Sequence, residues 1–321
     1  MRAMQLQQVG EPLKLVELPI PNPKSDEFLI KIEACAVCRT DLHIIEGDLK
    51  NPKLPLTLGH QIVGTTSEGK RVGVPWLGGT CQKCAFCRSG KENLCDRAIY
   101  TGYEKNGGFA EYCVAKKAYC FPIPQKYSAI HAAPLLCAGL IGYRSYRKCT
   151  DAKRIGFYGF GAAAHLLIQI ANFEKKEIYA FTRPGDKEGQ HFAKKLGCVW
   201  SGGSDQRSPD LLDAAIIFAP VGELIPTALQ SLKKGGIVVC AGIHMSNIPS
   251  FPYSLLWQER TVTSVANLTR KDGEEFFKLA ENLDIETSVT PYSLEELNQA
   301  IEDVRSGAVL GSAVVEISRS L

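Results

Sequence analysis

Beyond Arg154 the chain alternates short apolar runs with segments of helical spacing, and this alternation constrains the fold more than any other feature. The apolar runs are typical of buried strands and lie at residues 155–158, 178–181, 214–218 and 237–240. Helical spacing occupies the intervals between them, at residues 166–171, around 191–196 and at 225–232. Strands that alternate with helices predict a parallel, doubly wound sheet, so the expected fold class is α/β.

The N-terminal part of the chain follows a different pattern. Short alternating runs such as residues 28–33 are broken by prolines at positions 19, 21, 23, 52 and 55, which predicts short strands and turns. Residues 76–108 are rich in Gly and Cys and indicate a loop, whereas the apolar residues 128–148 predict a helix that leads into a new domain. The end of the chain predicts two helices and a final strand, near residues 272–283, 294–306 and 313–317.

A glycine-rich turn follows the first of the buried strands and contains the pattern G-x-G-x-x-A. Gly159 allows a tight turn, Gly161 lets the backbone approach a pyrophosphate, and Ala164 allows close packing of helix on strand. The first turn of the helix, which includes Ala162, favours an anion. The motif alone is weak, because a plain strand–helix turn can look the same. With a strand before it and a helix and strand after it, the motif predicts a dinucleotide site.

The end of the next strand bears on the choice of dinucleotide. Enzymes that use NAD usually place Asp or Glu there to bind the ribose 2′-OH, but this strand ends Phe181-Thr182-Arg183-Pro184. A hydroxyl and a guanidinium suit a 2′-phosphate, so the sequence favours NADP(H) over NAD(H). Two alternatives stay open, namely stacking of Arg183 on the adenine and approach of Asp186 to the ribose.

Four of the twelve cysteines lie close together, as Cys81-x-x-Cys84-x-x-Cys87 followed after seven residues by Cys95. Four thiolates in one loop can surround an ion tetrahedrally, and zinc is the natural occupant. A closed shell of four sulfurs leaves no position for substrate, so such a site is structural. An iron–sulfur cluster is the main alternative, although Asp96 stands where ferredoxins have a proline after the fourth cysteine.

Further candidate ligands are dispersed along the chain. Cys38-Arg39-Thr40-Asp41-Leu42-His43 places a thiol, a hydroxyl, a carboxylate and an imidazole within six residues. Gly59-His60-Gln61 and Leu135-Leu136-Cys137-Ala138-Gly139 follow later. Taken singly, each has an ordinary explanation, because a lone Cys in an apolar run is more often a small buried hydrophobe.

Taken together, and in this order, these segments resemble the zinc-containing medium-chain alcohol dehydrogenases over nearly the whole chain. Gly107-Gly108-Phe109-Ala110-Glu111-Tyr112 adds a further match, and Trp76-Leu77 before the four-cysteine run resembles the microbial branch. The resemblance implies a partly β, GroES-like catalytic domain interrupted by a Rossmann domain. The implied boundaries are 1–138 and 266–321 for the catalytic domain and 139–265 for the Rossmann domain.

The resemblance also assigns roles to individual residues. It implies a catalytic zinc with an open fourth position, held by Cys38, His60 and Cys137. Thr40 matches the hydroxyl that bonds the substrate oxygen, and His43 the residue that passes a proton to solvent. Asp41 matches the carboxylate that orients the zinc-binding imidazole. One departure is Gln61, which stands where the family usually has Glu.

The remaining implied contacts concern cofactor and substrate. Arg39 fits a pyrophosphate contact, and the segment beside the nicotinamide corresponds to Ala241, Gly242 and Ile243. The positions at which the family lines its substrate pocket carry apolar residues, namely Trp76, Leu77, Ile45 and Leu49. The two cysteine-containing sites together lead us to expect two zinc ions per chain, one catalytic and one structural. A nicotinamide cofactor is expected as well.

The implied function is reversible oxidation of a primary or secondary alcohol to an aldehyde or ketone. A polyol or sugar dehydrogenase of the same fold is an alternative, but such enzymes commonly replace the third ligand with a carboxylate, and this chain keeps Cys137. A non-catalytic, redox-sensing protein on this fold is a second alternative. Such a protein would not need a proton relay, so the presence of Thr40 and His43 argues against this alternative.

Composition narrows the partners. The 321 residues are 45% hydrophobic and 22% charged with a net charge of +3, and no basic block indicates nucleic-acid binding. No apolar stretch reaches 18 residues, and the N-terminus lacks the apolar core of a signal peptide, so a cytoplasmic location without a membrane partner is expected. A small-molecule substrate and a homodimer or homotetramer complete the expectation.

Overall fold

The computed structural model describes residues 1–49, 51–309 and 311–317. The chain divides into a first unit of Met1–Leu140 and Asn267–Leu321 and a second unit of Ile141–Ala266. Helix α4 (Ala138–Tyr146) carries the chain from one unit to the other.

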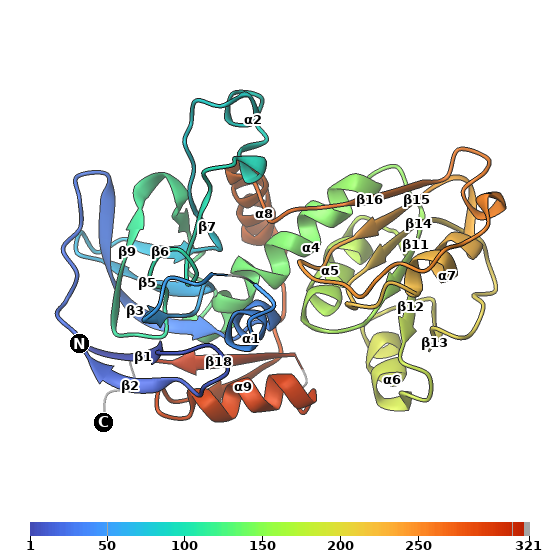
Figure 1. The fold of residues 1–321 in the computed structure, drawn as a ribbon. Coiled ribbons are helices and arrows are strands. Elements are labelled where there is room, and N and C mark those ends of the chain that lie inside the picture. The colour runs from blue at the N-terminus through green and yellow to red at the C-terminus, as the bar shows by residue number, and fades with distance from the viewer. Residues whose placement is uncertain (50, 310, 318–321) are drawn as a thin grey trace. The chain divides into compact units, whose positions relative to one another are not determined.

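The second unit contains a six-stranded parallel sheet with the strand order β13-β12-β11-β14-β15-β16 (Figure 1). This order, with the first strand at the centre, is that of a doubly wound dinucleotide-binding fold, so the predicted α/β class is confirmed. The strands are β11 (Arg154–Tyr158), β12 (Glu177–Thr182), β13 (Trp200–Gly203), β14 (Leu212–Ile217), β15 (Leu232–Cys240) and β16 (Thr261–Ser264). The helices that pack on them are α5 (Ala162–Phe173), α6 (Lys187–Lys195) and α7 (Leu224–Gln230).

The elements of this unit differ from the prediction in several places, of which the start of β15 differs most. The helix expected to run to residue 232 ends at Gln230, and strand β15 already begins at Leu232, five residues before the expected start. The early part of β15 reads Leu-Lys-Lys-Gly-Gly, with Lys234 and Gly235 exposed, so it lacks the apolar pattern by which a buried strand is recognised.

The first unit is built around a mostly antiparallel sheet, in which only β17 and β18 pair in parallel among the described strands, and its centre is strand β3 (Glu27–Ala36). The strand order is β10-β6-β5-β3-β18-β17, and β9 also pairs with β3. The other strands are β5 (Ile62–Thr66), β6 (Arg71–Val74), β9 (Tyr112–Lys116), β10 (Phe121–Pro122), β17 (Val289–Tyr292) and β18 (Ser312–Glu316). A separate three-stranded sheet contains β1 (Arg2–Leu6), β2 (Lys14–Glu17) and β4 (Leu56–Thr57).

Helices cover this sheet and complete the core of the first unit. Helix α9 (Leu297–Ser306) buries Leu297, Ala300 and Ile301, which lie three and four residues apart and so form one face. That helix runs alongside β18 and also contacts α1 (Arg39–Glu46) (Figure 1). The remaining helices are the short α3 (Ala129–Ala132), which leads into η3 (Ala133–Leu136), and α8 (Arg270–Asn282).

The region expected to be a loop at residues 76–108 contains short elements. It holds β7 (Leu77–Gly79) paired with β8 (Ile99–Tyr100), together with α2 (Ala85–Arg88) and η1 (Glu92–Leu94). These elements are only two to four residues long, too short for a periodic pattern to reveal them. Among residues 1–49, 51–309 and 311–317, no helix is long and apolar enough to cross a bilayer.

One buried side chain in α5 lacks the usual partners of a polar group. His165 is 2% exposed, and neither of its ring nitrogens has a hydrogen-bond partner among the described residues. Its ring centroid lies 6.2 Å from that of Phe192 on α6. Burial lowers the pKa of His165 to about 4, so the ring is neutral in the folded protein at neutral pH.

This neutral histidine predicts a specific dependence of stability on pH. An unfolded histidine titrates near pH ~6.5, so between about pH 6.5 and 4 the unfolded chain binds a proton that the folded chain does not. The free energy of unfolding should therefore fall as the pH is lowered through this range, by at most about 3 kcal/mol. The substitution His165→Leu should remove this part of the pH dependence and raise the melting temperature at pH 5.

Thermal unfolding between pH 4 and 7.5 tests this expectation. The matched control is His191→Leu, because His191 lies on α6 and is exposed, and it should leave the pH dependence as in the wild type. An identical pH dependence for wild type and His165→Leu would contradict the assignment.

Candidate active site

Cys38 lies between the central strand of the first unit and helix α1. The backbone of Val37 donates to Ala313 O at 2.9 Å, which holds the end of β3 against the C-terminal strand. Cys38 is the N-cap residue of α1, and its N–H donates to Asp41 Oδ2 at 2.8 Å. Cys38 is therefore held by a strand on one side and a capped helix on the other.

His60 lies in a tight segment before β5. Gly59 has φ of +92°, and a Cβ there would lie 2.8 Å from Cys35 Sγ and 3.0 Å from the ring of Phe109, so only glycine fits. Asp41 Oδ1 accepts from Gly59 N at 3.3 Å and lies 3.3 Å from His60 Nδ1. Asp41 and His60 are both fully buried.

The structure brings Cys38, His60 and Cys137 together. One ligand atom of each lies within 4.8 Å of the others, and Cys38 Sγ is 3.8 Å from Cys137 Sγ. That separation is close to the edge of a tetrahedron with metal–sulfur bonds of about 2.3 Å. Cys137 is the residue between η3 and α4. All three residues of the cluster therefore belong to the first unit.

The protonation states of the cluster are strongly shifted. Hydrogen bonding with the Cys137 thiol lowers the pKa of Cys38 well below its usual value, and the same contact raises the pKa of Cys137. Burial alone would lower the pKa of His60, but the neighbouring Asp41 carboxylate and Cys38 sulfur raise it to about 10. Such shifts mark a site that is built to hold positive charge among its sulfurs and carboxylate.

The other residues predicted for this site differ in how far their side chains are buried. Thr40 is buried with its Oγ1 3.6 Å from Cys38 Sγ, and Gln61 is buried next to His60. His43 lies at the last turn of α1 with 13% of its side chain exposed. Arg39, the first residue of α1, is exposed.

Trp76 lies directly beside His60. Its ring centroid is 4.7 Å from that of His60 in an edge-on arrangement, and Tyr100 and Tyr103 stack on it at 5.2 and 5.9 Å. Of the other residues predicted to line the substrate pocket, Leu77 and Ile45 are buried, and Leu49 packs partly buried against the same core. Sequence reasoning missed both tyrosines, because nothing in the local pattern connects them with position 76.

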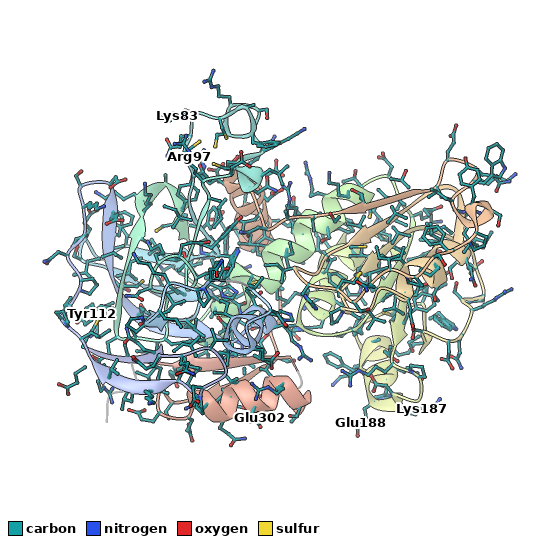
Figure 2. The ribbon with its side chains drawn as sticks, in the orientation of Figure 1. Lys83, Arg97, Tyr112, Lys187, Glu188 and Glu302 are labelled. Atoms are coloured by element: carbon teal, nitrogen blue, oxygen red, sulfur yellow. The ribbon has the colours of Figure 1, made fainter. Side chains whose placement is uncertain are left out.

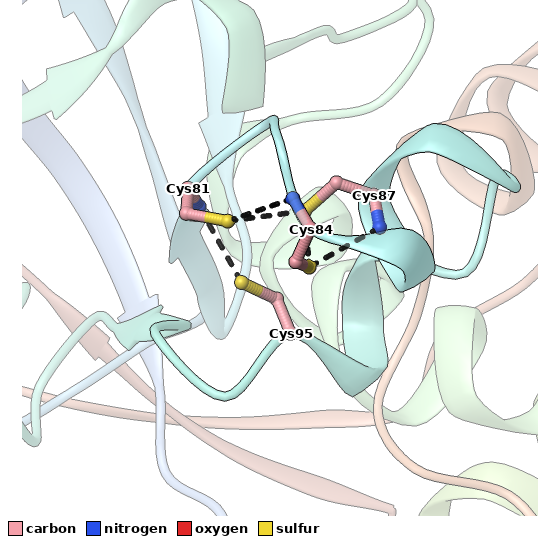
Figure 3. A group of neighbouring side chains, drawn as sticks. All are labelled: Cys81, Cys84, Cys87 and Cys95. Carbon is pink, nitrogen blue, oxygen red and sulfur yellow. Dashed lines mark hydrogen bonds between the residues drawn. The ribbon is translucent and has the colours of Figure 1, made fainter.

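The four-cysteine segment forms a second cluster (Figure 3). The sulfurs of Cys81, Cys84, Cys87 and Cys95 point toward one another, all within 4.8 Å. Cys87 Sγ lies 3.9 Å from Cys81 Sγ and 3.5 Å from Cys84 Sγ. Backbone N–H groups of Lys83 and Cys84 lower the pKa of Cys81 to about 6, which favours the thiolate form that binds metal.

A buried carboxylate ties this lobe, residues 80–97, to helix α8. Glu92 is buried, and its Oε1 accepts from Arg270 N at 3.0 Å and from Arg270 Nε at 3.2 Å. Figure 2 shows Lys83 and Arg97 on the outside of the lobe, where both are exposed. The lobe therefore turns one acidic side chain inward to a partner and leaves its cationic side chains in solvent.

The predicted dinucleotide residues gather at one edge of the parallel sheet in the second unit. Tyr158, Phe181, Ile217 and Cys240 lie in register across four strands, so the residues that follow them share the carboxyl edge. Ligands of doubly wound folds bind outside this edge. Ala241, Gly242 and Ile243 follow β15 there, with Ala241 buried and Ile243 exposed.

The two glycines of the motif meet different requirements. Gly159 has φ of +88°, and a Cβ there would lie 2.9 Å from Ala219 N. A Cβ at Gly161 would meet nothing within 4 Å, and Gly161 is the N-cap of α5 without a side-chain cap. The turn thus leaves open space in front of uncapped backbone N–H groups, as binding of a pyrophosphate requires.

Thr182 lies buried at the end of strand β12. Strand β12 runs one residue further than expected, and Thr182 is 4% exposed. Its hydroxyl lies 3.2 Å from Arg183 O and 3.4 Å from Gly202 O and accepts from Gln190 Nε2. The hydroxyl is thus engaged within the protein, and its contact with a 2′-phosphate stays a prediction. Arg183 is exposed at the same edge, and Asp186 caps α6 by accepting from Gly189 N at 2.8 Å.

Comparison with known proteins agrees with this geometry. Residues 24–125 match the family described as the alcohol dehydrogenase GroES-like domain. The chain is 40% identical to the probable alcohol dehydrogenase AdhA of Mycobacterium tuberculosis, over 95% of this chain and 93% of that protein. The chain belongs to the zinc-containing medium-chain alcohol dehydrogenase family. Its GroES-like and Rossmann folds, predicted from the resemblance, are confirmed.

Solved structures share the alcohol dehydrogenase fold over its full length. The CAD of Helicobacter pylori complexed with NADP(H) has a TM-score of 0.89 at 19% identity, covering 100% of this chain and 99% of its own. The acetophenone reductase of Geotrichum candidum in complex with NAD has a TM-score of 0.89 at 24% identity, covering 100% and 98%. The predicted alcohol dehydrogenase activity is confirmed by the family, and the non-catalytic alternative is not supported.

Proposed function

We propose that this alcohol dehydrogenase is zinc-dependent and that Cys38, His60 and Cys137 hold the catalytic ion. The observation that carries the proposal is the buried ring of His60. Its Nε2 has no hydrogen-bond partner among the described residues, although a buried polar atom normally has one. A ligated metal ion would satisfy it. Two sulfurs and one imidazole with a position left open are the ligand set of a catalytic zinc.

The residues around this site would bind the substrate, transfer the proton and orient the imidazole of His60. Zinc at an open site supplies Lewis acidity, which favours loss of the proton from an alcohol. Thr40, whose hydroxyl adjoins Cys38, would bond the oxygen of the alcohol, and His43 would pass the released proton toward solvent. Asp41 would keep the His60 ring oriented, since it lies 3.3 Å from Nδ1.

A second, structural zinc is proposed for Cys81, Cys84, Cys87 and Cys95. All four sulfurs lie within 4.8 Å of one another, which leaves no open position for substrate. The spacing also suits an iron–sulfur cluster, so metal content decides between them.

Metal analysis tests both sites at once. The metallated protein should carry two zinc ions per chain, and Cys38→Ser should lower activity on the order of a hundredfold or more while retaining the lobe zinc. Cys95→Ser should lose one zinc and much stability, since a structural zinc contributes on the order of 10 kcal/mol to folding. Iron in the lobe, or a single zinc in fully metallated protein, would contradict the proposal.

The cofactor of the proposed reaction is a nicotinamide dinucleotide, with NADP(H) favoured over NAD(H). Support for the preference now rests on Arg183 alone, because the hydroxyl of Thr182 is engaged within the protein. A guanidinium matches a phosphate with several donors in one plane. Asp186, the competing ribose contact, already accepts a hydrogen bond from the first turn of α6.

Steady-state kinetics with both cofactors test this preference. The wild type should have a higher kcat/KM with NADP(H), and Arg183→Ala should narrow the ratio by about ten- to a hundredfold, the value of one charge-assisted contact. Lys195→Ala removes an exposed charge at the far end of α6 and should leave the ratio unchanged. Equal or better efficiency of the wild type with NAD(H) would show that Arg183 does not select the phosphate.

Assembly into a homodimer or homotetramer is also proposed. Strand β16 is an edge of the sheet in the second unit, and nearby segments expose large apolar side chains, with Tyr253 69% and Trp257 59% exposed. An exposed cluster of this kind marks an association surface.

Light scattering after size-exclusion chromatography should give two or four times the chain mass of 35.1 kDa. Trp257→Glu should shift the protein toward monomer, because burying an unpaired carboxylate at an interface is costly. A monomeric wild type at assay concentration would refute the assembly.

A further inference from the structure

Three of the four sulfurs in the lobe accept hydrogen bonds from backbone N–H groups (Figure 3). Cys81 N donates to Cys95 Sγ at 3.4 Å, and Cys84 N donates to Cys81 Sγ at 3.3 Å. Cys87 N donates to Cys84 Sγ at 3.5 Å. The sulfur of Cys87 itself accepts no backbone N–H from the residues that the structure describes. Hydrogen bonds to the sulfurs offset the negative charge that four thiolates bring to one ion, so Cys87 needs a donor of another kind.

The side chain of Thr80 supplies this donor. Burial would raise the pKa of the Cys87 thiol, but hydrogen bonds with Thr80 and with the sulfurs of Cys84 and Cys95 lower it. A thiolate only accepts hydrogen bonds, so the Thr80 hydroxyl donates in this pair. Thr80 Oγ1 also lies 2.6 Å from Tyr119 OH. Because the proton of Thr80 is directed at the sulfur, its oxygen accepts from Tyr119, and a chain of two hydrogen bonds ends on Cys87.

The other end of this chain is fixed in the body of the first unit. Tyr119 is 1% exposed, and the guanidinium of Arg270 lies over its ring, with Cζ 5.4 Å from the ring centroid. Arg270 is the first residue of α8, and its backbone N and its Nε both donate to Glu92 Oε1 in the lobe. Arg270 therefore contacts the lobe directly through Glu92, and it also packs on the tyrosine that reaches the lobe through Thr80.

We infer that Thr80 and Tyr119 are positioning residues for the ion of the lobe, because their chain of hydrogen bonds holds the Cys87 sulfur. Without the chain, Cys87 is the ligand that detaches most easily, since the other three sulfurs keep their backbone donors. This inference rests on the structural zinc proposed for the lobe and adds the residues that retain it.

The test follows the release of zinc from the fully loaded protein to a zinc-binding dye. The release phase that persists in Cys38→Ser identifies the lobe ion, since that variant keeps all four lobe cysteines. Thr80→Val keeps the shape of the side chain but removes the hydroxyl, and it should release the lobe ion about 10- to 100-fold faster than the wild type. Thr80→Ser restores the hydroxyl and should bring the release rate most of the way back to that of the wild type.

Tyr119→Phe removes the first donor of the chain and should speed release of the lobe ion by about 3- to 10-fold, the effect of one hydrogen bond. Because Tyr119 acts through Thr80, adding Tyr119→Phe to Thr80→Val should cause no further acceleration. The matched control is Thr65→Val on β5, which removes a hydroxyl that donates to Glu33 Oε1 at 2.6 Å. It should release zinc as the wild type does.

A wild-type release rate for Thr80→Val, in protein that carries the lobe zinc, would overturn the inference and leave the proposed function intact. Multiplied effects in the double variant would also overturn it, because they would show that Tyr119 acts independently of Thr80. If Thr80→Val does not fold, Tyr119→Phe decides, and a wild-type release rate for that variant overturns the inference. A fully loaded wild type without zinc in the lobe would instead contradict the proposed structural site, and the inference with it.

Discussion

The buried carboxylate of Asp41 is the contact on which the arrangement of the first unit depends. It accepts hydrogen bonds from the backbones of Cys38 and Gly59 and lies against Nδ1 of His60. These groups come from segments about twenty residues apart, and one fully buried charge joins them. A buried carboxylate costs free energy unless it is paired and hydrogen-bonded. The fold therefore gains from keeping the segments of Cys38 and His60 together whether or not an ion lies between them.

The alternating strands and helices of the second unit were predictable because each has its own pattern of apolar residues. Strands β11, β12 and β14 are continuous apolar runs, as expected for strands buried on both faces of a parallel sheet. The errors fall where that pattern fails. The start of β15 contains two lysines and two glycines, and β12 extends one residue further than predicted and buries Thr182. A hydroxyl can enter such an edge because neighbouring carbonyls and Gln190 satisfy it.

The residues of the candidate site were predictable only where the spacing of the cysteines or the resemblance to the family indicated them. The four lobe cysteines are close in sequence, and their convergence follows from that closeness. The contacts of Tyr100 and Tyr103 with Trp76, and of Arg270 with Glu92, join segments 24 residues or more apart. No periodicity encodes such contacts, because packing between segments determines them.

The place of β18 in the first unit also orders events during synthesis. The second unit is one continuous stretch, Ile141–Ala266, and can fold once that stretch has left the ribosome. The first unit cannot be completed then, because β18 (Ser312–Glu316) lies in its sheet beside β3. Until β18 emerges, the end of β3 (residues 34–36) has no partner on that edge, and the backbone hydrogen bond from Val37 N to Ala313 O next to Cys38 cannot form. While the second unit is being translated, the end of β3 next to Cys38 therefore lacks its partner strand. This is the interval in which a chaperone would protect the nascent chain.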